Sequence, residues 1–141
     1  MLPSIQGSFP MNPKPVKTER RILVVDDEPR TREAVSLYLQ GLGYVVESTG
    51  DAQGGLEIVR KGVDLVISDI RMPEMDGLEF LQEIRSVHPG LPVILITGYP
   101  GPEASWDARQ LEATAFLSKP FRLETLANHI RMIFGEAEPS R

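Results

Sequence analysis

The stretch RILVVDDEPRTRE, residues 21–33, contains the pattern that decides the fold. Four consecutive apolar residues, 22–25, run directly into three acidic ones, 26–28, and Pro29 then begins a polar, helix-forming run. An apolar run without polar alternation is typical of a strand buried on both faces. The stretch therefore predicts a buried strand, an acidic loop and a helix. Adjacent carboxylates repel one another, so their place at the end of a hydrophobic strand needs a physical reason.

The same pattern recurs along the chain. Five apolar runs alternate with helical segments, at residues 22–26, 44–48, 64–69, 92–97 and 115–119. Alternating strands and helices predict a parallel sheet with helices on both faces. Right-handed crossovers then bring the carboxyl ends of all strands to one edge, where such sheets bind ligands. In the first helix we expect a buried stripe with a glycine C-cap. The residues of this expectation are Ala34, Leu37, Tyr38, Leu42 and, for the cap, Gly43.

Composition narrows the class of protein. A chain of 141 residues fits one domain, and its net charge of -5 argues against a non-specific nucleic-acid binder. Cysteine is absent, and neither a membrane-spanning apolar run nor a signal peptide is evident, so we expect a cytoplasmic protein. We interpret residues 1–19 as a disordered leader or a remnant of cloning, 20–135 as the folded domain and 136–141 as a frayed tail.

Polar side chains gather at the predicted carboxyl edge of the sheet. They are Asp26, Asp27, Asp69, Thr97 and Lys119. Asp64 does not belong to them, because it opens the third strand and lies about 16 Å from Asp69. Each residue alone has an ordinary explanation, such as a helix cap or a solvated loop residue. Three carboxylates together in an apolar sheet, however, destabilise the fold unless a cation binds them.

Magnesium is the cation that this set of oxygen ligands predicts, because it takes one or two carboxylates and leaves positions for phosphate oxygens. A hydroxyl and a lysine opposite the ion suit a phosphoryl group, whose transfer depends on positioning and charge neutralisation. One of the acids could act as a nucleophile and form an acyl phosphate. Asp69 is the best candidate, because it alone ends the third strand, which βαβ topology places beside the first.

The segments VVDDEP, DLVISDIRMPEMDG, ILITGY and AFLSKPF resemble, in order and spacing, the receiver domain of two-component response regulators. The resemblance covers about residues 20–134. It implies a flavodoxin-like, doubly wound α/β sandwich with five parallel strands in the order 2-1-3-4-5 and five helices. It also implies a signalling domain of a phosphorelay rather than an enzyme, with at most slow self-dephosphorylation. A histidine kinase or phosphotransfer protein would phosphorylate Asp69, and the face of the fourth helix, fifth strand and fifth helix would switch.

The resemblance also assigns roles to single residues. Asp27, Asp69 and the backbone carbonyl of Arg71 would bind magnesium directly, and Asp26 would act through a water molecule. Thr97 and Lys119 would contact the phosphoryl oxygens. The remaining implied positions are the aromatic switch residue Phe116, the loop residues Met72, Pro73 and Gly77, and a cis peptide bond at Lys119–Pro120.

Some features depart from the family pattern or leave alternatives open. Arg71 and Tyr99 occupy two variable positions that tune the lifetime of the phosphoryl group, and Glu112 replaces a usual helix-ending glycine. A degenerate receiver that binds a partner without phosphorylation remains an alternative, as does a phosphatase with an aspartyl nucleophile. Arg71 counts against the phosphatase, which would need an acidic residue two positions after Asp69. The output partner, a missing output domain and a homodimer are not specified by the sequence, and neither nucleic acid nor membrane is expected as a direct partner.

Overall fold

The structure of the protein, a computed structural model, describes residues 19–72, 74–98 and 113–136. The predicted fourth helix falls on residues 99–112, outside the described residues, and so do Pro73, Tyr99 and Glu112. Most of the predicted leader and tail also lies outside them. The described strands are β2 (Arg21–Val25), β3 (Val45–Thr49), β4 (Leu65–Asp69), β5 (Val93–Thr97) and β6 (Ala115–Ser118). The described helices are α1 (Pro29–Gly41), α2 (Ala52–Lys61), α3 (Gly77–Val87) and α5 (Leu123–Phe134).

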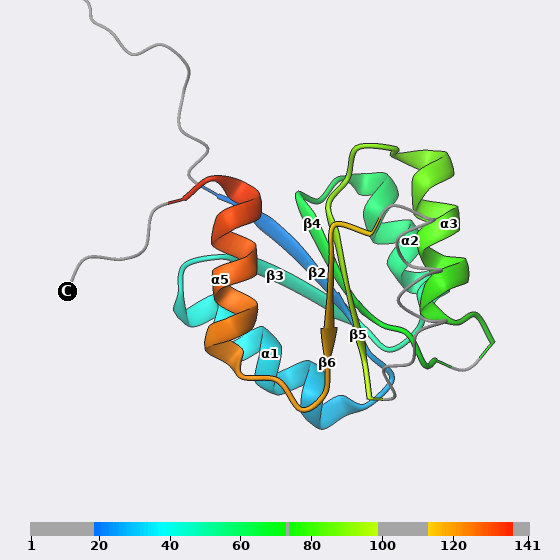
Figure 1. Ribbon diagram of the computed structural model, residues 1–141. Helices are drawn as coiled ribbons and strands as arrows, with labels where there is room; N and C mark the ends of the chain where they lie inside the picture. Colours follow the sequence, from blue (N-terminus) through cyan, green and yellow to red (C-terminus); the bar gives the residue numbers. More distant parts are fainter. Residues whose placement is uncertain (1–18, 73, 99–112, 137–141) are drawn as a thin grey trace, which may run out of the picture.

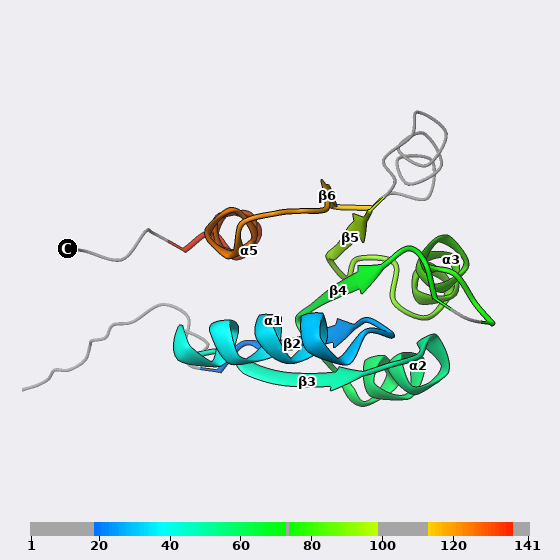
Figure 2. The ribbon, with the colours of Figure 1, turned by 90° about the horizontal axis from the view of Figure 1, so that it is seen from below.

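The five strands form one parallel sheet in the order β3-β2-β4-β5-β6 (Figure 1). Counted along the chain this is the order 2-1-3-4-5, so the predicted flavodoxin-like topology is confirmed. Helices α1 and α5 cover one face of the sheet, and α2 and α3 cover the other (Figure 2). Four helices are described where five were expected, and the segment expected to form the remaining helix, residues 99–112, lies outside the described residues.

Two apolar cores explain why the strand sequences show no polar alternation. In β2, Leu23 and Val25 pack into the core beneath α2 and α3, whereas Ile22 and Val24 pack into the core beneath α1 and α5. Successive side chains of a strand point to opposite faces, so a sheet covered on both faces favours apolar residues at successive positions. The central strands β4 and β5 are buried along their whole length.

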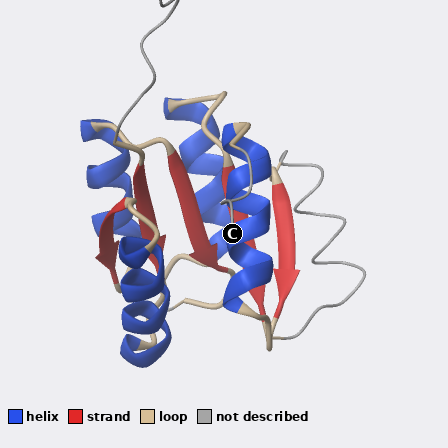
Figure 3. Cartoon of the chain, turned by 90° about the vertical axis from the view of Figure 1, so that its left-hand side faces the viewer, coloured by secondary structure: helices blue, strands red, loops and turns tan. Residues whose placement is uncertain are grey.

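The strands all run in one direction, so their carboxyl ends lie at the same edge of the sheet (Figure 3). Asp64 lies at the opposite edge, where its carboxylate accepts a hydrogen bond of 2.7 Å from the Arg21 backbone amide. Asp64 therefore fixes the start of the β2–β4 pairing, and it is separate from the acidic residues at the carboxyl edge, as predicted.

Helix α1 corrects one sequence expectation. Its buried residues are Val35 and Leu39, whereas Leu37 is 60% exposed and Leu42 is 41% exposed. Apolar residues occur around much of this helix, so the sequence could not fix which stripe faces the sheet. Gly43 does support the helix end: its φ is +103°, and the amide of the next residue bonds back to the Leu39 carbonyl at 3.2 Å.

Among the described helices, none has the length and apolar character needed to cross a membrane.

A cluster at the amino edge joins the two ends of the described domain. The Tyr44 hydroxyl donates a 2.8 Å hydrogen bond to Glu136, and Arg20 lies 3.4 Å from the same carboxylate. The Arg20 guanidinium also lies 4.5 Å from the centre of the Phe134 ring. We call these four residues the terminal clasp. The clasp raises the pKa of Tyr44 to about 12, chiefly through burial and then through its bond to Glu136.

Candidate functional site

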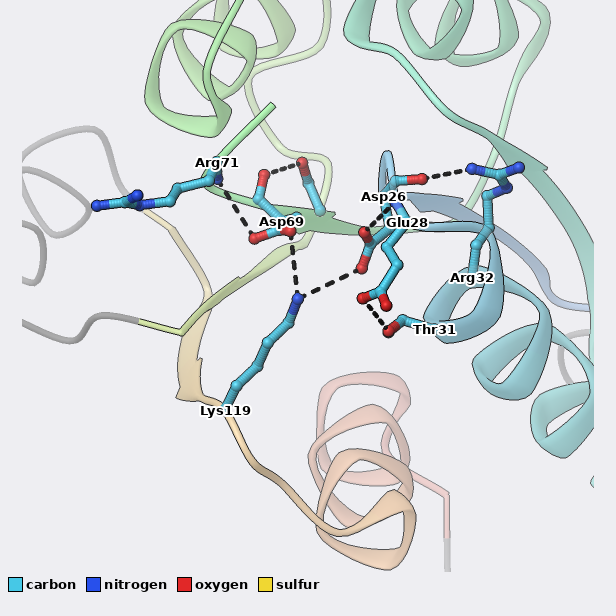
Figure 4. Close-up of polar contacts among 8 residues, drawn as sticks. Asp26, Glu28, Thr31, Arg32, Asp69, Arg71 and Lys119 are labelled. Atoms are coloured by element: carbon cyan, nitrogen blue, oxygen red, sulfur yellow. Dashed lines mark hydrogen bonds and ion pairs between the residues drawn. The ribbon is translucent and has the colours of Figure 1, made fainter. Parts of the chain in front are cut away.

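The carboxyl edge of the sheet brings the predicted polar residues together, and Figure 4 shows Asp26, Asp69 and Lys119 among them. Asp69 is the last residue of β4, Thr97 the last of β5, and Asp26 directly follows β2. These three side chains are buried, whereas Asp27 is exposed. Backbone pairing continues past the strands, because the Asp26 amide bonds to the Thr49 carbonyl and the Lys119 amide bonds to the Thr97 carbonyl. The sheet itself therefore fixes where the site residues lie.

Asp69 is held from two sides. Its Oδ2 lies 3.3 Å from the Lys119 ammonium, and its Oδ1 accepts a hydrogen bond of 3.3 Å from the Arg71 amide. The Ser68 hydroxyl donates to the Asp69 backbone carbonyl at 3.0 Å. The Asp69 side chain thus has a defined direction and lies beside a cation, at a depth where few water molecules compete for it.

Asp26 shares the same cation. The Lys119 ammonium lies 3.7 Å from Asp26 Oδ2, and the Glu28 amide donates to Asp26 Oδ1 at 2.9 Å. The backbone carbonyl of Asp26 accepts a third contact, a 2.6 Å hydrogen bond from Arg32 Nη1. Asp26 is consequently fixed through its side chain and through both of its peptide groups.

Burial dominates the electrostatics of Asp26. It raises the pKa of Asp26 above the ordinary value of 3.8, although the Glu28 amide and Lys119 both favour the ionised form. Burial alone would lower the pKa of Lys119, but the charges of Asp26 and Asp69 outweigh it, and the pKa is raised. Lys119 therefore stays protonated, and its single positive charge does not fully offset the cost of burying the carboxylate of Asp26.

The acidic residues fit a hard divalent cation. One carboxylate oxygen from each of Asp26, Asp27 and Asp69 lies within 4.8 Å of the other two. Oxygen ligands of magnesium lie about 2.0–2.1 Å from the ion, so small side-chain rotations or one bridging water would complete such a site. The exposed carboxylate of Asp27 leaves a route for the ion and its water ligands. The donor set is thus chemically suited to magnesium.

The loop between β4 and α3 closes one side of the site. Its end is fixed by Gly77, whose amide donates to the Ile70 carbonyl at 2.6 Å. A Cβ atom at this position would lie only 2.5 Å from the Asp69 carbonyl oxygen. Asp76 caps α3 through a reciprocal pair of hydrogen bonds with Glu79. The start of α3 therefore presses directly on the backbone of Asp69, and no side chain fits between them.

Other predicted residues occupy different surroundings. The Arg71 side chain is exposed and, in Figure 4, extends away from the carboxylates, so only its backbone amide is seen to contact Asp69. Phe116 and Met72 are partly buried and pack against the core beneath α2 and α3. The Lys119–Pro120 peptide bond is cis, as the resemblance implied. Tyr99 and Pro73 lie outside the described residues.

Two residues near the site were missed by the sequence reasoning. Arg32 binds the Asp26 carbonyl and Ser68 binds the Asp69 carbonyl. Both act on backbone atoms, which leave no pattern in the sequence. The only available signal for Arg32 was its position one helical turn into the segment that follows the acidic loop.

Comparisons with known proteins agree with this geometry. The profile described as the response regulator receiver domain matches residues 22–131. The transcriptional regulatory protein GlrR of Escherichia coli (strain K12) is 37% identical over 120 residues, which is 84% of this chain and 27% of GlrR. The chain thus spans about a quarter of the length of that relative.

Solved structures of receiver-domain proteins, almost the whole length of which this chain covers, are also similar to it. A CheY-like response regulator receiver domain protein from Methanospirillum hungatei has a TM-score of 0.80 and 31% identity, over 82% of this chain and 94% of that one. The response regulator TrrA of Thermotoga maritima, solved in complex with Mg(2+)-BeF, has a TM-score of 0.74 and 34% identity. That match covers 81% of this chain and 98% of TrrA.

Proposed function

This chain belongs to the response regulator receiver domain family, and from that premise we propose that it accepts a phosphoryl group on Asp69 in a magnesium-dependent phosphorelay. The observation that carries the proposal is the position of the Lys119 ammonium. It lies 3.3 Å from Asp69 and 3.7 Å from Asp26, and so joins the proposed acceptor to the proposed metal site. A cation at that point neutralises charge on a phosphoryl oxygen as well as on the acceptor carboxylate.

The chemistry follows from the side-chain positions. A carboxylate oxygen of Asp69 attacks the phosphorus atom of a phosphohistidine, the new O–P bond forms, and the P–N bond breaks with its electrons going to the imidazole nitrogen. Bound magnesium would supply charge neutralisation for the phosphoryl oxygens. Lys119 would move from its carboxylate contacts to a phosphoryl oxygen, and the hydroxyl of Thr97 would donate to another.

The proposed ligand set for magnesium combines the family resemblance with the observed cluster. Asp27, Asp69 and the Arg71 backbone carbonyl would bind the ion directly, and Asp26 would act through a water molecule. The exposure of Asp27 supports its role as a direct ligand, because an incoming ion meets it first. The similar response regulator TrrA was solved in complex with Mg(2+)-BeF, which supports magnesium as the ion.

A histidine kinase or phosphotransfer protein is the proposed phosphodonor, acting in the cytoplasm. GlrR is a transcriptional regulatory protein of which this chain matches about a quarter, so the output is proposed to lie in a partner or an attached domain. We propose that the phosphorylated state reaches that output, or a second copy, through β6, α5 and residues 99–112. Thr97 would transmit the change towards residues 99–112, and Phe116 would respond to it. Tyr99, together with Arg71, would tune the lifetime of the phosphoryl group.

Intact-mass measurement after incubation with acetyl phosphate and magnesium tests the proposal. Wild type should gain one phosphoryl group, and either EDTA or Asp69→Asn should abolish the gain. Asp64→Asn is the matched control. Asp64 directly precedes β4, the strand that Asp69 ends, and lies at the opposite edge of the sheet. An asparagine oxygen at this position can still accept the hydrogen bond from Arg21.

Labelling that persists in Asp69→Asn would show that the acceptor is misassigned. A wild-type chain that stays unlabelled would instead support a binding module that works without phosphorylation. Repeated turnover of a generic phosphate ester would point to the phosphatase.

A further inference from the structure

The guanidinium of Arg32 contacts the loop that contains the proposed metal ligands, although Arg32 itself lies on helix α1. Its Nη1 donates a 2.6 Å hydrogen bond to the backbone carbonyl of Asp26 (Figure 4). A Cβ atom built on Gly50 would lie 3.0 Å from the same nitrogen. The guanidinium is therefore enclosed between α1, the loop after β2 and the loop after β3, and its direction is fixed.

The carbonyl that Arg32 binds belongs to the peptide that joins Asp26 to Asp27. That peptide is planar, so holding its oxygen also holds the nitrogen from which Asp27 begins. The Asp26 amide is bound to Thr49 on the preceding side, at 3.2 Å. Asp26 has further side-chain contacts to Glu28 and Lys119, whereas the exposed Asp27 depends on the peptide that carries it.

We infer that Arg32 is a positioning residue for the magnesium site, and that it sets the direction of the Asp27 carboxylate by holding the Asp26 carbonyl. The inference rests on the proposed function, because it presupposes that the acidic residues bind the ion. A hydrogen bond from a charged donor is stronger than one between neutral groups, so its loss releases the peptide plane. Loss of a residue that orients a metal ligand typically weakens metal affinity about tenfold or more.

Charge alone predicts the opposite effect, and this makes the inference testable. Arg32 is a cation near an acidic metal site, so if it acted only through its charge, its removal would strengthen magnesium binding. If it acts by positioning, its removal weakens binding. The sign of the change in the magnesium Kd distinguishes the two.

The experiment measures magnesium binding to the full chain by titration calorimetry, together with urea unfolding in EDTA. Arg32→Met removes every donor while keeping an unbranched, helix-forming side chain. We expect its magnesium Kd to rise about tenfold. Arg30→Met is the matched control, because Arg30 is an exposed arginine of the same helix and carries the same charge. Its Kd should stay unchanged or fall slightly. Arg32→Lys retains the positive charge and a single donor nitrogen, so its magnesium Kd should lie between those of wild type and Arg32→Met.

A magnesium Kd for Arg32→Met that equals or falls below that of wild type would overturn the inference, as would an equal loss in Arg30→Met. If Arg32→Met lacks a cooperative unfolding transition, Arg32→Lys decides. The ammonium of lysine cannot reproduce the planar guanidinium contact, so its Kd should rise while its metal-free stability is kept, and a wild-type Kd would refute positioning. Wild type that binds no magnesium would overturn the proposed function itself, and the inference with it.

Discussion

Gly77 offers a direct test of how closely the fold supports the acceptor residue. Gly77 is the first residue of α3, and an added Cβ atom would lie 2.5 Å from the Asp69 carbonyl oxygen and 2.6 Å from Ile70 Cα. Real Cβ contacts stay above 3.0 Å, and both neighbours are backbone atoms that no rotamer change can move. Gly77→Ala must therefore push α3 away from the end of β4 by at least about 0.5 Å.

The energetic cost follows from this overlap. Forcing one extra carbon into a packed position costs about 1–3 kcal/mol, and the better helix propensity of alanine offsets at most about 1 kcal/mol. We expect Gly77→Ala to lose about 1–2 kcal/mol of unfolding free energy. Because catalytic geometry tolerates only about 0.5 Å of error, the displaced Asp69 should also accept a phosphoryl group roughly tenfold more slowly.

Two assays separate these effects. Urea unfolding in EDTA gives the stability without metal, and the rate of mass gain from acetyl phosphate and magnesium gives the reactivity of Asp69. Gly41→Ala is the matched control, because Gly41 ends α1 and its Cβ atom would meet nothing within 4 Å. That variant should match wild type or be up to about 1 kcal/mol more stable. Wild-type stability and rate in Gly77→Ala would refute the close contact between α3 and Asp69.

The remaining predictions concern Asp26, Glu74 and Tyr44. Burial raises the pKa of Asp26, so its ionised form destabilises the metal-free protein as pH rises above 3.8; Asp26→Asn should therefore raise the urea midpoint in EDTA at pH 7. Protonation of Asp26 removes the negative charge that holds the ion through its bound water, so magnesium affinity measured by calorimetry should fall as pH falls through that raised pKa. Glu74 has a φ of +73°, and Glu74→Gly should stabilise the protein by up to about 1 kcal/mol in urea unfolding, whereas no change would mean that the loop relaxes freely. The pKa of Tyr44 is raised to about 12, chiefly by burial and then by the bond to Glu136, so the stability that its neutral hydroxyl contributes is complete below pH 10 and is lost as pH rises from 10 to 12. Tyr44→Phe should flatten the curve of stability against pH in that window, and an unaltered curve would contradict the raised pKa.

The sheet and the acidic site were predictable for the same reason. A strand buried on both faces is mostly apolar, so its carboxyl end is marked by polar residues such as Asp69 in β4 and Thr97 in β5. In a parallel sheet those ends meet at one edge, so residues separated by tens of positions could be grouped without any knowledge of side-chain contacts.

Other features depend on contacts that a linear pattern does not encode. The predicted buried face of α1 was wrong, because apolar residues on several sides of the helix allowed more than one buried stripe. The residues that face the sheet are Val35 and Leu39. Arg32 binds a backbone carbonyl, an acceptor present at every residue. Tyr44 and Glu136 are 92 residues apart and belong to no strand pairing, so only the folded chain brings them together.

The terminal clasp has a consequence for protein engineering. Arg20 and Glu136 are in ionic contact at 3.4 Å, so the points where the chain enters and leaves the folded domain are neighbours. A domain whose two ends meet can be inserted into a surface loop of a host protein with little disturbance of that loop, and its ends can be joined by a short linker in a circular permutant. Both ends also lie at the edge of the sheet opposite Asp69, so an insertion there leaves the acidic edge open. The receiver domain can thus be inserted into another protein with its attachment point and its acidic site at opposite edges of the sheet.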